Sequence, residues 1–556
     1  MIKKPGSEFP QSAKRAPTLV GALRKSTTRK IFFSTIFIFA IFILLPVAHA
    51  QAASRYWVGG NANWDATAGT KWALTSGGAG GQAVPTAADA VFLDNGTGTG
   101  NVTIGSGYTA LALSLNCTGY IGTLSSINGT GGLTVSGAVT FVAGMTLTTT
   151  NMLSVRTTGA TLTSGGQTWG GNMTFNNAVT WTLADDWHVS GNILFTNNIV
   201  INGNTLYTGG DLQNTTTASV TGTTVFVMNG TGAVDTVSGS FGFPLTFNTA
   251  GTITITALNY KIKTLTYTAG TMITTGSTLA VNAGTTTILD TSGMTWNNVI
   301  INGTTTTTLL SDLNLSGNLS LGSTTLTTTI NGLFNVNVGG NVTQSGTTSI
   351  ITGTATIVMT AAGTGTWSSS SAGSLRNPIT LAGTDTISGT VAFAFNTLTI
   401  SGTLAGVSTP VLTLGTSAVV TANTSGITIP TISVATTGTV TFNGTNGFSI
   451  GTLTDANAGS TLTWAHGNTY TINTALTLTG TSASHITFNS DLGGSQAIFT
   501  LPNGGATQDV SFVNATDIDS SAGQTIQDYS GILSNTLNWL VTGGTTSITL
   551  AFTFIL

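Results

Sequence analysis

The sequence SGGQTW at residues 164–169 returns as SGMTW at residues 292–296 and, without its tryptophan, as SGIT at residues 425–428. Other segments return in the same order, including the tripeptide SGN, which stands at residues 190–192 and again at residues 316–318. A long repeat whose spacing drifts slightly without losing its order is typical of stacked structural units with small loop insertions. The chain is therefore an array, and an array favours presentation of a long surface over enclosure of one reaction.

Short extended segments fill the space between these landmarks. Runs such as VFVM at residues 225–228 and ITI at residues 253–255 are separated by Gly-Thr, Asn-Gly or Ser-Gly pairs. Threonine and valine favour pleated backbone, and the glycine and asparagine punctuation interrupts any helical period. The pattern predicts an all-β fold.

Two all-β packings satisfy this pattern. The first is a right-handed parallel β-helix, a β-solenoid in which each strand stacks on its equivalent in the next coil, with about 20 to 25 residues per coil and about 20 coils. The second is a string of tandem β-sandwich repeats, each with its own core and usually a recognisable linker. No linker is evident and proline is sparse, which favours the solenoid. In it we expect aliphatic rows inside, threonine ladders outside, and turn asparagines bonded to the next coil.

The chain begins with a segment that resembles an export signal. A basic stretch ending in Arg29 and Lys30 precedes an apolar run at residues 31–47, and Ala48-His49-Ala50 follows. This order predicts a Sec-type signal peptide with an unusually long basic region, cleaved after Ala50, and hence an extracellular or cell-surface protein. An uncleaved anchor is the alternative, because the apolar run is near the lower limit for spanning a bilayer.

Composition divides the rest of the chain into four parts, each with its own expected role. These are an aromatic-rich N-terminal cap at 51–101, a repeat array at 102–441 with super-repeats near 164–291, 292–424 and from 425 onward, C-terminal coils and a cap at 442–540, and an apolar tail at 541–556 with no assigned role.

The N-terminal segment carries three tryptophans, Trp57, Trp64 and Trp72, among glycines. A divergent, aromatic start is expected of a cap, because the first coil of a solenoid has an open edge that would otherwise pair with another chain. The same flat rings can stack on the apolar faces of sugars. We therefore take these three residues as the candidate glycan-binding site as well as cap residues.

Charge restricts the partners. Beyond residue 50 the chain has 6 Lys and Arg residues against 16 Asp and no Glu, a net charge of −10. Phosphate neutralisation needs clustered basic residues, so this composition argues against nucleic acid as a partner and against an anionic membrane surface. The single cysteine, Cys117, excludes a disulfide framework and is expected to be a small buried side chain.

Two clusters of polar residues are candidates for chemistry. Asp186 and His188 alternate along a strand and so share one face, but a solvated turn is the interpretation we favour for this stretch. Asp517 and Asp519 are separated by one residue and are expected on one face of a strand, where they suit Ca²⁺ coordination or an inverting carboxylate pair. No catalytic residue is assigned, and Ca²⁺ is the single candidate cofactor.

The leader, the charge-poor array and the aromatic start at residues 56–60 (YWVGG) together resemble the Thr/Gly/Asn-rich β-solenoid surface proteins of bacteria, such as filamentous-haemagglutinin-like and autotransporter-passenger adhesins. The resemblance implies a secreted or cell-surface structural and adhesive rod that attaches to glycans or to a host or neighbouring cell surface. Two alternatives remain open. One is a polysaccharide-active β-helix lyase or hydrolase, which needs converging acidic residues; the other is a surface-layer or matrix component that associates with itself.

Overall fold

The computed structural model describes residues 53–543 except for 98–99, 128–130, 157–159, 216, 218, 237–238, 257–259, 282–286, 293, 302–305, 323–326, 346–349, 361–364, 370–375, 389–392 and 405–410. The chain divides after Gln51, and the described residues belong to its second unit. The predicted leader and the part of the tail beyond Gly543 lie outside the described residues.

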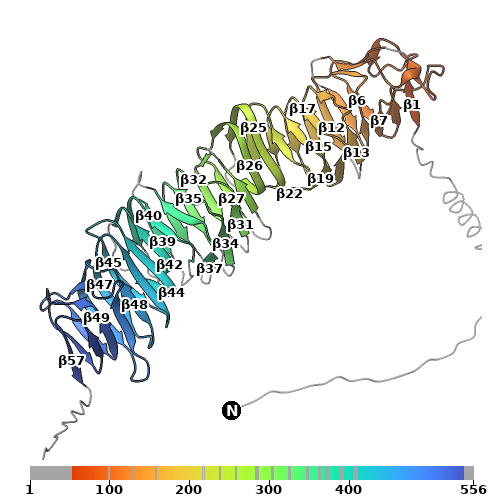
Figure 1. The fold of residues 1–556 in the computed structure, drawn as a ribbon. Coiled ribbons are helices and arrows are strands. Elements are labelled where there is room, and N and C mark those ends of the chain that lie inside the picture. Colours follow the sequence, from red (N-terminus) through yellow and green to blue (C-terminus); the bar gives the residue numbers. More distant parts are fainter. Residues whose placement is uncertain are drawn as a thin grey trace, which may run out of the picture. The chain divides into compact units, whose positions relative to one another are not determined.

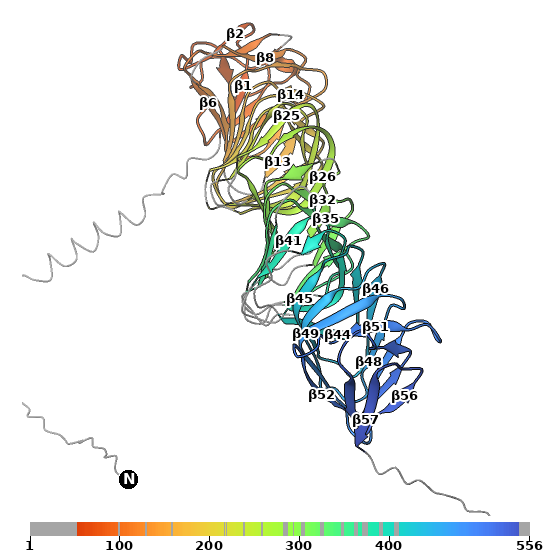
Figure 2. The same cartoon turned by 90° about the vertical axis from the view of Figure 1, so that its left-hand side faces the viewer.

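The described chain is a parallel β-solenoid of about 18 coils (Figures 1 and 2). Most coils contribute a strand to each of three faces, which we number 1, 2 and 3 in chain order. Strand β13 (Ala160–Thr163), for example, lies on face 1 and pairs in parallel with β16 (Thr180–Leu183), the face 1 strand of the next coil. Because consecutive coils pair in parallel and share one continuous core, tandem β-sandwiches are excluded.

Face 1 is formed by β1 (Ser54–Trp57), β4 (Ala90–Phe92), β7 (Ser114–Asn116), β10 (Val139–Thr140), β13, β16, β19 (Ile199–Gly203), β22 (Ser219–Thr221), β27 (Thr278–Val281), β30 (Asn298–Ile301), β33 (Leu319–Leu321), β36 (Val342–Gln344), β39 (Thr366–Ser369), β41 (Thr384–Ser388), β43 (Thr403–Leu404), β51 (Ala497–Thr500) and β54 (Ile518–Asp519). Face 2 is formed by β2 (Ala62–Trp64), β5 (Val102–Ile104), β8 (Thr123–Ser126), β11 (Thr146–Thr148), β14 (Thr168–Trp169), β17 (Trp187–Val189), β20 (Leu206–Thr208), β23 (Phe226–Met228), β28 (Thr287–Asp290), β31 (Thr306–Leu309), β34 (Thr327–Asn331), β37 (Ile350–Thr352), β52 (Thr507–Ser511), β55 (Ile526–Tyr529) and β57 (Trp539–Gly543). Face 3 is formed by β6 (Thr109–Ala112), β9 (Gly132–Val135), β12 (Met152–Arg156), β15 (Met173–Asn176), β18 (Ile193–Phe195), β21 (Leu212–Asn214), β24 (Gly232–Thr236), β29 (Thr295–Trp296), β32 (Leu313–Leu315), β35 (Asn335–Val338), β38 (Thr356–Met359), β40 (Ile379–Leu381), β46 (Thr439–Gly444), β48 (Thr461–Trp464), β50 (Ile486–Ser490), β53 (Val513–Thr516) and β56 (Ile532–Ser534).

Several long strands bend around a corner and serve two or three faces. They are β25 (Ser240–Ile255), β26 (Tyr260–Ile273), β42 (Phe393–Ile400), β44 (Val411–Ala422), β45 (Thr428–Val434), β47 (Ser449–Asp455) and β49 (Thr469–Thr479). At the N-terminal end, β3 (Trp72–Ala73) pairs antiparallel with β1, and a short 3-10 helix spans Asn95–Thr97.

Strand register fixes which side chains face inward. On face 3 one row runs from Leu153 through Met173, Ile193 and Leu212 to Val234, and all five side chains are buried. Each step along this row is one coil, and its length in sequence agrees with the predicted coil. Coil length varies further along the chain: the coil that leads from Tyr470 to its partner Phe499 exceeds the predicted length, whereas the coil from Asn514 to Ile532 falls short of it.

Asparagines at the corners link one coil to the next, as predicted. The side-chain oxygen of Asn172 accepts the backbone N–H of Asn192 at 2.9 Å, and that of Asn192 accepts the N–H of Asp211 at 2.8 Å. A second ladder of the same kind joins Asn298 to Asn318 and Asn318 to Asn341, at 2.8 Å each. These bonds satisfy corner backbone groups that the strands leave unpaired.

The two ladders are copies related by the super-repeat, yet they occupy different corners. The first lies between faces 2 and 3, before β18, and the second lies between faces 3 and 1, before β33. Following the strand pairs from Trp169 in β14, six coils lead along face 2 to β28, and Trp296 follows on face 3 in β29. The sequence repeat is therefore six coils plus one face, not the six coils that its length predicts.

Two glycines that occupy equivalent positions in successive super-repeats have the same backbone geometry, and substituting one of them tests how closely successive coils approach. Gly222 and Gly353 have φ of +134° and +137°, and a Cβ on either would collide with the carbonyl oxygen of the residue one coil earlier, Ile201 or Ile330. We expect Gly222→Ala to cost more than about 2 kcal/mol in the free energy of opening of its coil, because backbone strain and a backbone clash combine. Hydrogen exchange measures this cost.

The matched control for that substitution is Gly166→Ala. Gly166 also has a positive φ, +76°, but a Cβ there would meet no atom within 4 Å. It should cost about 1 kcal/mol, the strain of the left-handed backbone alone. Equal costs at the two glycines would contradict the close approach of successive coils at Gly222.

Candidate functional site

The three cap tryptophans lie inside the protein. Trp57, Trp64 and Trp72 are each 0% exposed, and the ring of Trp72 meets the other two edge-on at centroid distances of 5.1 Å. Their faces contact the core and not the solvent. The predicted role in sugar stacking is therefore wrong for these residues, because the rings fill the interior that the first coil would otherwise leave open.

The second candidate pair does not share a strand face. Asp517 has a φ of +58° and lies between β53, which ends at Thr516, and β54, which begins at Ile518. The left-handed residue interrupts the alternation on which the prediction depended. Asp517 is buried and accepts hydrogen bonds from the N–H of Gly494 and the side chain of Asn535, while Asp519 accepts the N–H of Ser521 at 2.8 Å. Both carboxylates thus hold turns.

Acidic side chains do not gather elsewhere in the described residues. No group of three or more His, Cys, Asp or Glu side chains placed to hold a metal ion is found among them. The carboxyl groups of Asp385, Asp455 and Asp528 are buried, but they lie in different coils. Burial raises the pKa of all three, that of Asp528 to about 6.

The polar stretch before β17 forms a corner. The Asp185 carboxylate accepts the backbone N–H groups of Ser164 and Gly165, at 2.7 and 2.8 Å, and Asp186 accepts that of Thr205 at 2.9 Å. His188 stacks on Tyr207 of the next coil, with ring centroids 4.2 Å apart. The aspartates thus fasten three coils together, which agrees with a solvated turn.

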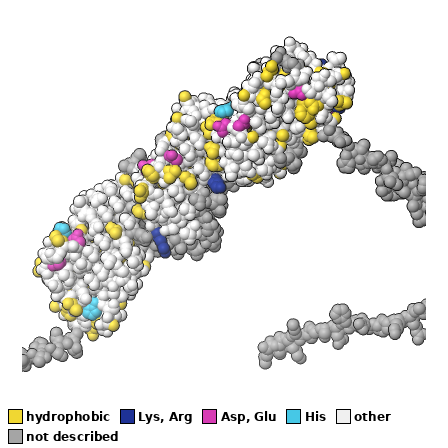
Figure 3. Space-filling model, turned by 45° about the vertical axis from the view of Figure 1, so that its right-hand side comes forward, with side chains coloured by type: hydrophobic (Ala, Val, Ile, Leu, Met, Phe, Trp, Pro, Cys, Tyr) yellow, Lys and Arg dark blue, Asp and Glu magenta, His cyan; other side chains and the backbone are white. Residues whose placement is uncertain are grey.

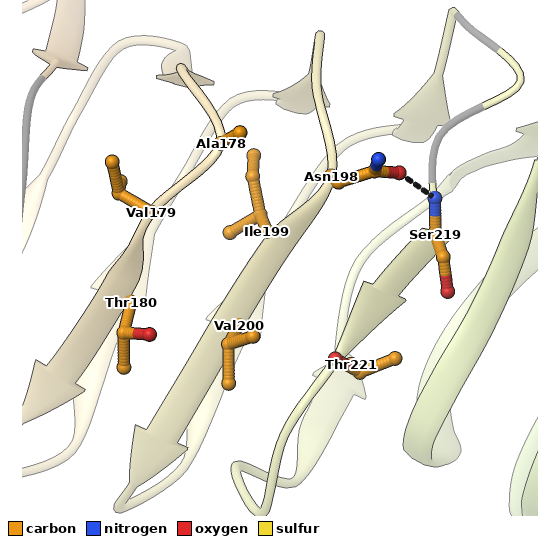
Figure 4. Close-up of a pocket in the computed structure, with 8 residues that line it drawn as sticks. All are labelled: Ala178, Val179, Thr180, Asn198, Ile199, Val200, Ser219 and Thr221. Atoms are coloured by element: carbon orange, nitrogen blue, oxygen red, sulfur yellow. Dashed lines mark hydrogen bonds between the residues drawn. The ribbon is translucent and has the colours of Figure 1, made fainter.

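A groove on face 1 is one concave site of the described residues (Figure 4). It has a volume of about 310 Å³ and crosses β16, β19 and β22, with Thr180, Val200 and Thr221 side by side along the rod. Asn198 lies at its edge and accepts the N–H of Ser219 at 2.8 Å. Among the described residues, no ionisable side chain lines this groove. Its outward row of methyl and hydroxyl groups can contact an uncharged extended ligand.

The second groove, of about 370 Å³, lies at the corner between faces 2 and 3. It is lined by Ser292, Leu310, Ser311, Asp312, Asn314 and Phe334, from three successive coils. Large apolar side chains are exposed here: Leu310 is 52% exposed, Phe334 39%, and the neighbouring Leu333 98%. On the surface in Figure 3, hydrophobic side chains likewise stand in small groups and acidic ones are scattered.

Neither groove was predicted from the sequence. Their lining residues lie one coil apart in the chain and become neighbours once the coils are aligned. Aligning the outward-facing positions of successive coils at the coil length could therefore have predicted these grooves. Within the described residues no helix is long and apolar enough to cross a membrane. Comparisons with protein-family models, with curated proteins and with solved structures find no match to this chain.

Proposed function

We propose that this β-solenoid is an exported, surface-exposed rod that binds uncharged polysaccharide chains along its outer faces. The observation that carries the proposal is the face 1 groove, which is elongated across three coils and lined by threonine, valine, serine and asparagine with no ionisable side chain among the described residues. A polysaccharide has the matching chemistry, because each sugar offers apolar C–H faces and hydroxyl groups at regular intervals.

Three further features support an adhesive role. The predicted leader implies export, and a surface with few charges can approach a neutral polymer without the cost of desolvating ions. The resemblance to bacterial β-solenoid adhesins points in the same direction. Binding by several shallow sites along a rod also gains strength through effective concentration, so no single site needs high affinity.

The direct test is retention of the purified protein on a panel of insoluble and immobilised polysaccharides, with and without Ca²⁺, scored in the same samples for chain cleavage. We expect retention without cleavage, and Val200→Asp should weaken it by about tenfold because a carboxylate would be desolvated in the groove. Val358→Asp is the matched control, since Val358 is an outward-facing valine of β38 on face 3.

Each outcome is decisive. Failure of the native protein to be retained on any polysaccharide would overturn the proposed function. If Val200→Asp and Val358→Asp weaken retention equally, the polysaccharide does not bind specifically in the face 1 groove. Release of sugar fragments would replace adhesion by enzymatic activity.

A further inference from the structure

The corner groove between faces 2 and 3 has a counterpart in the preceding super-repeat. Leu309 corresponds there to Leu183, and both are buried at the end of a strand. Asp312 and its counterpart Asp186 each accept one backbone N–H from the next coil, that of Asn335 at 2.8 Å and that of Thr205 at 2.9 Å. Both copies thus have the same hydrogen bond between the corner aspartate and the backbone of the next coil.

The two copies differ in the side chains that surround this hydrogen-bonded corner. The first copy has Ala184 after the strand, whereas the second has Leu310. In the next coil, a single residue, Asn204, separates Gly203 from the fastened Thr205, whereas Leu333 and Phe334 separate Gly332 from the fastened Asn335. The second copy has therefore gained three large apolar side chains, one of them by insertion.

The fold does not need these side chains. Leu310, Leu333 and Phe334 are exposed, and the first copy forms the same corner without them. Three exposed apolar side chains next to one another, at a groove whose other lining residues are mainly polar, indicate an interaction site.

Polar groups with unused bonding capacity lie beside the apolar ones. Asp312 uses its Oδ1 for the N–H of Asn335, and among the described residues its Oδ2 has no hydrogen-bond partner. Asn314 accepts a bond from the side chain of Asn337 at 2.8 Å through its Oδ1, which leaves its own N–H groups as donors. An acceptor and a donor thus share one groove with the Phe334 ring.

We propose that this groove is a second carbohydrate subsite, in which one pyranose ring packs its C–H face on Phe334 and Leu310 and shares hydroxyl groups with Asp312 and Asn314. This inference rests on the proposed function and specifies it. The site takes a sugar ring with one unsubstituted apolar face, whereas the face 1 groove contacts a chain along its length. An aromatic ring flanked by a carboxylate and an amide provides both the stacking surface and the directional bonds that a sugar requires.

The test uses the full chain with cellohexaose and mannohexaose as probes, followed by saturation-transfer NMR and by titration. We expect saturation of axial sugar protons in the native protein, and a loss of affinity of about tenfold in Phe334→Ala. Phe334→Tyr should retain binding, while Phe334→Leu should lose most of it because a flat ring face is needed. Tyr529→Ala, which removes a 56% exposed ring from another coil, should change nothing.

The two proposals fail separately. If both probes bind and Val200→Asp weakens them but Phe334→Ala does not, the subsite is overturned and the proposed function stands. If neither probe binds and no polysaccharide retains the native protein, both fail together. If Phe334→Ala instead abolishes self-association in sedimentation experiments while sugar binding is unchanged, the groove is an interface between copies of the chain, and the subsite is wrong.

Discussion

Replacing Trp72 by alanine is expected to cost about 3–5 kcal/mol in the opening free energy of the first coils. The ring is fully buried between Trp57 and Trp64, so its removal leaves a cavity in a region that has core neighbours on one side alone. Hydrogen exchange of residues 53–97, followed by mass spectrometry, measures the loss. Because contacts in a solenoid are made between neighbouring coils, protection beyond the middle of the array should be unchanged.

The control for this substitution is Leu74→Ala. Leu74 is close to Trp72 in the chain but is 53% exposed, and its truncation should change the opening free energy by less than about 0.5 kcal/mol. Retention on polysaccharide should survive Trp72→Ala, since the face 1 groove is several coils distant. If Trp72→Ala abolished retention on polysaccharide while hydrogen-exchange protection of residues 53–97 stayed unchanged, Trp72 would take part in binding after all.

The second large effect concerns pH. Asp528 occupies a row between Val510 and Val541 in the last coils, where it is buried and its Oδ1 has no hydrogen-bond partner among the described residues. Burial raises its pKa to about 6, against 3.8 for an ordinary aspartate, although the N–H groups of Val513 and Phe512 and the nearby His485 act in the opposite direction. The folded state therefore binds the proton more tightly than the unfolded state.

The sign of the effect follows from this difference. The contribution of Asp528 to stability is greatest below about pH 4, where both states are protonated, and it is lost as the pH rises from there through about 6, by about 3 kcal/mol. Asp528→Asn cannot ionise, so its last coils should lose less stability over the same interval. The measurement is the opening free energy of residues 507–543 at about pH 4, 5.5 and 7, corrected for intrinsic exchange.

Asp385 and Asp455, whose pKa values are also raised by burial, should give a pH dependence of the same sign in their own coils. They lie in earlier coils, so their contribution should appear in other peptides. Parallel pH curves for the native protein and Asp528→Asn in residues 507–543 would contradict an ionisable carboxyl in that row.

The fold could be predicted because its determinants are local and repeated. Coil length was visible in the spacing of glycine and asparagine, and inward rows followed from the alternation of strands such as β16. The one-face offset of the super-repeat was not predictable, since a spacing in the sequence becomes a number of coils only when each coil length is known. The longer coil after Tyr470 shows that this length varies along the chain.

The predicted exposure of the cap tryptophans and the predicted shared strand face of Asp517 and Asp519 were wrong for more specific reasons. The sequence near Trp57 shows glycines around aromatic residues, and this pattern is the same whether a ring covers an open core or faces a ligand. At Asp517 a single left-handed residue reverses the expected side-chain direction, and although aspartate tolerates this backbone better than most residues, its type alone does not predict it. Phe334 was not considered at all, because its significance depends on comparison with Asn204 in the preceding copy, and that comparison needs the aligned corners.

The offset of the super-repeat determines on which side of the rod each duplicated feature lies. A feature that the repeat duplicates returns six coils later but on the next face, as Asp186 and Asp312 do at successive corners. A rod of this kind resting on a flat sheet can turn only one copy toward it. Under the proposed function, copies on different faces would contact polysaccharide chains on different sides of the rod, so one molecule would cross-link several chains.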